Sequence, residues 1–125
     1  MKDYCKYDID LEFGLMHETR IRNIFESGSK IEVKTERDFW HKSGNIAIEI
    51  EFRGKPSGLS TTKADYWIHV LSLGDEMQMA LLFSVPKLKE LVKKAIRMPA
   101  TNIIYGGDDG ASKIILIPLS AVLLA

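Results

Sequence analysis

The sequence lacks the features of several protein classes. Its 125 residues include one cysteine, Cys5, which excludes an internal disulfide framework and a thiolate-rich zinc site. Residues 1–10 hold no apolar stretch, so we expect no secretory leader. The apolar residues 114–125 are too few to span a bilayer, and Pro118 interrupts them, so we expect a buried closing strand there. Together these absences predict a cytoplasmic protein that makes no contact with a membrane.

An excess of charge of one sign is also missing. Lys plus Arg and Asp plus Glu each number 17, and the sequence pI is about 6.8. A protein that only coats nucleic acid usually carries a basic excess, so this balance argues against that role. It remains compatible with a basic surface whose charge is offset by clustered carboxylates. With 46% hydrophobic residues and neither repeat nor linker, residues 1–125 are predicted to form a single domain.

The first predicted element is a helix over residues 11–26, which Asp10 can cap. Leu11, Ile21 and Phe25 share one stripe of this helix by their spacing. Glu18 lies on the same stripe. Because a carboxylate on a buried face is unusual unless something satisfies it, we expect Glu18 to turn toward a partner.

Two alternating segments follow, residues 31–36 and 45–52, separated by a turn-prone stretch. We expect them to form a hairpin in which Glu32 lies opposite Glu49, so that Lys34, Glu49 and Glu51 project from the same face as Glu32. Like charges placed opposite one another destabilise a sheet, so these carboxylates require a counter-charge. Lys34 can supply one, and Mg²⁺ suits such a cluster. Alternation alone, however, fits an ordinary solvated face equally well.

The remaining segments predict further strands and one helix. Ser84 can cap this helix, and Pro86 falls in its first turn, where proline is favoured. The predicted order is therefore α-β-β-β-β-α-β-β, an α/β (mixed α+β) domain with a mixed sheet covered by at least two helices. The expected strands are residues 65–72, 77–84, 102–105 and 113–120.

Basic residues follow the second strand of the predicted hairpin. Arg53, Lys55 and Lys63 bring positive charge to its carboxylate end, among glycines that allow backbone to approach a phosphate. We therefore expect these three to contact DNA phosphates. Trp40, near the predicted hairpin tip, is a further candidate for stacking on a base. Folding of this side chain back onto the sheet is the favoured alternative.

The segment EVKTERDFWHKSGNIAIEIEFRGKPSGLSTTKADYW resembles the small phage-type branch of the PD-(D/E)XK nuclease superfamily, which includes the Holliday-junction resolvases. The resemblance covers roughly residues 10–95 and is strongest over 31–67. It implies a restriction-endonuclease-like fold, a central mixed β-sheet flanked by helices. By this resemblance Glu18 matches a first-helix glutamate, Glu32 the metal-binding carboxylate of the first strand, and Glu49 the acidic residue of the motif strand. All three would be metal ligands.

The chain departs from the family pattern at one position. Glu51 falls where the motif has its lysine, so it would serve as a base or metal ligand. The catalytic lysine is then either Lys34, which we favour, or Lys63. A competing alignment takes Glu32-Val33-Lys34 itself as the motif, and both alignments use Glu32 and Lys34.

The resemblance implies a Mg²⁺-dependent nuclease, with Mn²⁺ able to substitute, that hydrolyses DNA in phage-type recombination, repair or degradation. Such an enzyme would be phage-encoded and act in the host cytoplasm. Related small enzymes often form dimers, so a homodimer through the apolar C-terminal segment is a further expectation. The alternative is a non-catalytic module that keeps the nuclease fold for binding nucleic acid or protein. The neutral charge and Glu51 keep this alternative open.

Overall fold

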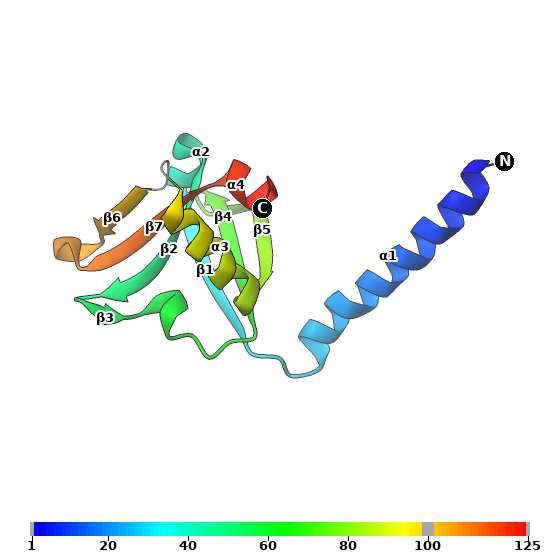
Figure 1. Ribbon diagram of the computed structural model, residues 1–125, viewed down its shortest axis with the longest axis horizontal. Coiled ribbons are helices and arrows are strands. Elements are labelled where there is room, and N and C mark those ends of the chain that lie inside the picture. The colour runs from blue at the N-terminus through cyan, green and yellow to red at the C-terminus, as the bar shows by residue number, and fades with distance from the viewer. Residues whose placement is uncertain (1, 99–101, 125) are drawn as a thin grey trace.

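The structure, a computed structural model, describes residues 2–98 and 102–124, with side chains described from residue 11 onward. The helices are α1 (Lys2–Glu26), α2 (Phe39–Ser43), α3 (Val85–Arg97) and α4 (Leu119–Leu124), with 3₁₀ turns at Gly58–Ser60 and Asp108–Gly110. The strands are β1 (Ile31–Arg37), β2 (Asn45–Phe52), β3 (Lys55–Pro56), β4 (Tyr66–Leu73), β5 (Glu76–Ser84), β6 (Asn102–Gly106) and β7 (Ser112–Pro118). The predicted order of the main elements is confirmed, and the fold is mixed α+β (Figure 1).

The strands form two sheets, so the prediction of one central sheet is wrong. One sheet has the order β1-β4-β5, and the other has the order β3-β2-β7-β6. β1 runs parallel to β4, whereas β2 pairs antiparallel with β7. The predicted hairpin between β1 and β2 is therefore also wrong. The five-residue helix α2 separates these two strands, and Gly44 ends it in the left-handed conformation with φ 73°.

Packing of apolar rows explains why β2 pairs with β7. Ile46 lies opposite Ile117, and Ile48 lies opposite Ile115. All four side chains are fully buried, so this pairing places two apolar rows in the core. These rows pack in one core with β4 and α3, contributed by Trp67, Leu71, Leu88, Leu91, Val92 and Ala95 among others.

Helix α3 begins as the sequence predicts. Ser84 occupies the N-cap position and Pro86 lies in the first turn. Apolar residues of this helix turn inward, among them Leu88 and Leu91. In the last turn Ala95 is buried, whereas Ile96 is 46% exposed.

β1 turns its charged residues toward the inside of the molecule. Paired residues on neighbouring strands project from the same face, and β1 is in register with the buried residues of β4. We call this the inner face of the three-stranded sheet. Its rows are Glu32–Trp67–Phe83, Lys34–His69–Leu81 and Glu36–Leu71–Met79. Val33, by contrast, faces outward and is 56% exposed.

Helix α1 extends away from the two sheets (Figure 1). It begins at Lys2, earlier than the predicted start at residue 11. The stripe predicted to be buried is exposed, at 53% for Leu11, 45% for Ile21 and 58% for Phe25. The prediction that Glu18 lies on a buried face is therefore wrong in this arrangement. None of the helices in the described ranges is both long and apolar enough for a membrane span.

The C-terminal segment changes from strand to helix at a proline. β7 ends at Pro118, and α4 takes up residues Leu119–Leu124. Pro118 lacks the N–H needed to continue the ladder and fixes a backbone angle that suits the first turn of a helix. The prediction of a closing strand is thus right for β7 and wrong for α4, where Leu123 and Leu124 are exposed.

Candidate active site

A small cavity lies where the two sheets approach each other. Its volume is about 200 Å³, and β1, β2 and β4 form its walls together with the turn at Gly58. The lining residues are Lys34, Thr35, Glu36, Ala47, Glu49, Gly58, Trp67 and His69. The structure therefore brings together Lys34 and Glu49, two residues that the sequence singles out, although by a route other than the predicted hairpin.

Glu49 is held as a carboxylate on the β2 side of the cavity. The Ser57 hydroxyl donates a hydrogen bond of 2.7 Å to its Oε2 atom. Hydrogen bonding from Ser112 and from Ser57, with the positive charge of Lys34, lowers the pKa of Glu49 below its ordinary value of 4.5, and partial burial opposes this effect. The side chain therefore enters any reaction at neutral pH as an anion.

Lys34 connects the two acidic residues. Its Nζ atom lies 3.7 Å from Oε1 of Glu32, and both side chains keep partial exposure, 50% for the lysine and 39% for the glutamate. The same ammonium group acts on Glu49 from across the cavity. The Lys34 ammonium group thus acts on one carboxylate from β1 and on one from β2.

A glycine allows the turn after β3 to approach Glu49. Gly58 has φ +54°, and a Cβ atom built on it would lie 2.3 Å from the backbone oxygen of Glu49. A side chain cannot fit at such a distance, so the approach depends on glycine. The close contact also places the neighbouring Ser57 hydroxyl on the Glu49 carboxylate.

An irregularity in β2 separates Glu49 from Glu51. The register against β7 shifts between these residues, so Glu49 lies opposite Ile114 and Glu51 lies opposite Lys113. Glu51 pairs with the Lys113 ammonium group at 3.8 Å instead of joining the cavity. The prediction of Glu32, Glu49 and Glu51 on one hairpin face is therefore wrong.

Sequence reasoning missed a buried polar relay, which we define as Glu36, His69 and Trp67. Trp67 Nε1–H donates to His69 Nδ1 at 3.2 Å, and His69 Nε2 is hydrogen-bonded to Glu36 Oε1. The same carboxylate oxygen accepts the backbone N–H of Ala47 at 2.5 Å. This pattern assigns the Nε2–H tautomer to His69 and leaves neither ring nitrogen free. The relay ties β1 and β4 to the edge of β2, and so fixes Lys34 relative to Glu49.

The signal for this relay was present in the sequence. Glu36 follows Glu32 and Lys34 at every second position of β1, so its side chain projects from the same inner face. His69 stands between the apolar Trp67 and Leu71 on one face of β4, where a polar ring requires hydrogen-bond partners. The missing information was that β1 and β4 are neighbours.

The predicted DNA-binding cations lie outside the cavity. Arg53, in the turn after β2, stacks its guanidinium group 5.4 Å from the centre of the Phe52 ring. Lys55 is exposed on β3. Lys63 lines a separate hollow together with Lys89. None of the three is brought to the cavity lining.

Two further predicted residues are placed differently from expectation. Trp40 is 6% exposed and its Nε1–H donates to the Ser72 carbonyl oxygen at 2.7 Å. It is a core residue, so the prediction that it stacks on a base is wrong and the alternative, folding back onto the sheet, is correct. Glu18 is exposed on α1 and does not line the cavity.

The donor set can be tested against the needs of Mg²⁺. No group of three or more His, Cys, Asp or Glu side chains within residues 2–98 and 102–124 is arranged to hold a metal ion. Magnesium, however, commonly takes only one or two carboxylates and completes its shell with water and substrate phosphate. Glu49 lines the cavity and Glu32 pairs with Lys34, so the number and type of donors, two carboxylates, match this smaller requirement.

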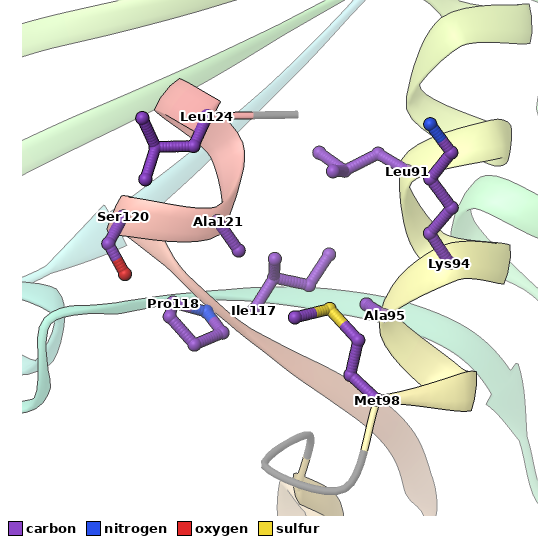
Figure 2. A pocket seen from close by; sticks show the side chains of 9 residues that line it. All are labelled: Leu91, Lys94, Ala95, Met98, Ile117, Pro118, Ser120, Ala121 and Leu124. Carbon is purple, nitrogen blue, oxygen red and sulfur yellow. The ribbon is translucent and has the colours of Figure 1, made fainter.

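A more apolar hollow lies elsewhere in the described part of the chain. Figure 2 shows it between α3 and α4, with Leu91 and Ala95 facing Ala121 across Ile117. Its volume is about 420 Å³, and Lys94 is the charged residue in its lining. Its lining contains no carboxylate, so we place the candidate chemistry in the smaller cavity.

The cavity lining thus holds Lys34 from one sheet and the ionised Glu49 from the other, and Glu32 pairs with Lys34. Comparison with protein families, with curated proteins and with solved structures gives no match for this chain.

Proposed function

We propose that this protein is a metal-dependent nuclease that hydrolyses DNA phosphodiester bonds in phage-type recombination, repair or degradation. The observation that carries the proposal is Lys34, which lines the cavity together with the ionised Glu49 and pairs with Glu32 at 3.7 Å. Phosphoryl transfer requires this combination, carboxylates for a divalent cation and a positive charge for the phosphate. The restriction-endonuclease-like fold remains an implication of the family resemblance, although the strands form two sheets and not one central sheet.

The residues have distinct roles in this proposal. Glu49 and Glu32 would hold Mg²⁺, or Mn²⁺ in its place, and the ion would supply Lewis-acid chemistry and a water of lowered pKa. Lys34 places its ammonium group where negative charge develops on the phosphate. The Ser57 hydroxyl orients the Glu49 carboxylate. His69 takes no proton from the reacting groups, because both of its ring nitrogens are engaged.

The exposed cations outside the cavity would bind DNA away from the scissile bond. Arg53 and Lys55 lie at the turn joining β2 to β3, and β2 also carries Glu49. Contacts with phosphate fix the register of a duplex and weaken with added salt. Lys63 supplies a further positive charge from the hollow beside α3.

A matched pair of glutamate variants tests the proposal. Glu49→Gln removes the carboxylate in the cavity, and we expect cleavage to fall at least about 100-fold. Glu51→Gln removes a carboxylate two positions further along β2, whose partner is Lys113, and cleavage should remain within about twofold. The measurement is cleavage of labelled single-stranded, duplex and branched DNA with Mg²⁺, with Mn²⁺ and with EDTA.

The outcomes separate the candidates. Equal loss of cleavage in both variants, or undiminished cleavage in Glu49→Gln, contradicts the assignment of the site. DNA binding by the wild-type protein without cleavage in either metal supports the non-catalytic module instead. Circular dichroism of each variant shows whether the fold is intact.

A further inference from the structure

The three-stranded sheet has a second, uncovered face. We call this the outer face; it consists of the residues of β1, β4 and β5 that alternate with those of the inner face. Its rows are Ile31–Tyr66–Ser84, Val33–Ile68–Leu82 and Thr35–Val70–Ala80. Val33 is 56% exposed and Leu82 is 36% exposed, so the central row is apolar but open to solvent.

The pattern of β4 indicates that this face is covered in the working protein. β4 carries apolar residues on both of its faces, Trp67 and Leu71 inward, Ile68 and Val70 outward. A strand with apolar residues on both faces is typical of a sheet that is covered on both sides. The inner face has such a cover from α3, whose Leu88 packs in the same core.

Helix α1 has the complementary surface. Leu11, Leu15, Glu18, Ile21 and Phe25 lie along one stripe at helical spacing, and each of the four apolar members is at least 45% exposed. The stripe is about 21 Å long at the rise of an α-helix. An eight-residue strand such as β4 is about 26 Å long, so the stripe matches the length of the outer face.

We propose that α1 of one copy of this chain covers the outer face of a second copy, and that the exchange is reciprocal. The geometry favours a second copy because α1 already extends away from its own sheets (Figure 1). Only residues 27–30 connect α1 to β1, with Gly28 at φ +79°. Short connections of this kind favour exchange of an element between identical chains.

The exchange covers both exposed apolar surfaces, the stripe of α1 and the outer face of the three-stranded sheet. A helix laid on a sheet is a standard layer arrangement, and the dimer contains two such contacts related by symmetry. Thr35 and Tyr66 flank the central row of the outer face. Their hydroxyl groups are available as donors to Glu18, the carboxylate within the stripe. The C-terminal segment plays no part in this interface.

The first test is the mass of the full chain in solution by size-exclusion chromatography with light scattering. We expect a dimer that Phe25→Asp converts to a monomer, and Leu82→Asp should have the same effect from the opposite side of the contact. Phe25 lies on α1, outside the sheets, so this variant leaves the body of the fold intact. Leu123→Asp, at a site 78% exposed on α4, is the matched control and should remain dimeric.

Cross-linking then identifies the two surfaces in contact. In a Cys5→Ser background, Ile21→Cys with Leu82→Cys and a short bis-maleimide should give a product of two chains on a denaturing gel. A cross-linked product of a single chain means that α1 folds back on its own sheet and overturns the proposal. A two-chain product from Ile21→Cys alone means that α1 pairs with α1, which also overturns it. So does a monomeric wild-type protein at micromolar concentration.

Discussion

Two glutamates in the second half of β2 lie in different settings. Glu49 faces a cavity, accepts a hydrogen bond from Ser57 and is held as an anion by two hydroxyl groups and a lysine. Glu51 lies two positions further on and pairs with Lys113 outside the cavity. The shift in register between them causes the difference, because without it both side chains would project from one face.

The comparison shows that the site is made by backbone geometry as much as by side chains. Gly58 permits a close approach to Glu49, and Glu36 holds the edge of β2 next to β1. Glu51 takes part in a partly exposed ion pair with Lys113, and ion pairs near the surface contribute little to stability. Substitutions around Glu49 should therefore lower the free energy of unfolding much more than equivalent substitutions around Glu51.

The largest effect is expected from Gly58→Ala. Its Cβ atom would meet the backbone oxygen of Glu49 at 2.3 Å, and its φ of +54° is unfavourable for alanine. We expect a loss of at least about 2 kcal/mol in the free energy of unfolding, measured by urea titration. Gly54→Ala is the control, since φ is +77° there but the space is open, and about 1 kcal/mol should be lost. Equal losses would contradict the argument from close approach.

Glu36→Ala should have the next largest effect on stability. It leaves the Ala47 N–H and the His69 Nε2–H without an acceptor, and each unpaired buried group costs about 1–3 kcal/mol. Glu51→Ala, which breaks only a partly exposed ion pair, should cost about 0–1 kcal/mol. Denaturant titration of both variants measures the difference.

A spectroscopic control distinguishes the relay from a general loss of packing. The indole N–H resonance of Trp67 reports its hydrogen bond to His69, and Trp40→Phe identifies it among the two indole signals. Glu36→Ala should move the Trp67 signal and leave the Trp40 signal in place. Glu36→Gln keeps an acceptor oxygen and should recover part of both the stability and the shift. An unmoved Trp67 signal would show that the relay does not couple to Glu36.

The order of elements was predictable from the sequence because its signals are local. Alternation locates β1 and β2, and Ser84 with Pro86 marks the start of α3. Such patterns involve residues close together in the chain. They also identify Lys34 and Glu49 as residues of interest, and both line the cavity.

Pairing between distant segments was not predictable in the same way. β2 and β3 lie between β1 and β4 in the sequence. The alternation of residues in β1 does not indicate that its neighbour in the sheet is β4. The same alternation is equally consistent with the predicted hairpin between β1 and β2. The relay of Glu36 and His69 was missed for this reason, and the separation of Glu51 from Glu49 depends on a register shift that alternation does not reveal.

The smallest effect expected concerns the ionisation of Glu49. Its pKa in the folded protein is lowered, so its charge stabilises the fold above the ordinary value of 4.5, and this contribution is lost as pH falls through the lower folded value. Ser112 provides the larger hydrogen-bond effect, followed by Ser57. We therefore expect Ser112→Ala to raise the pKa of Glu49 more than Ser57→Ala does, and Lys34→Met to raise it least. Titration of the side-chain carboxyl ¹³C signal, assigned with Glu49→Gln, measures each shift. The reverse order would mean that the cation across the cavity, and not the hydroxyl groups on the β2 side, controls the charge of Glu49.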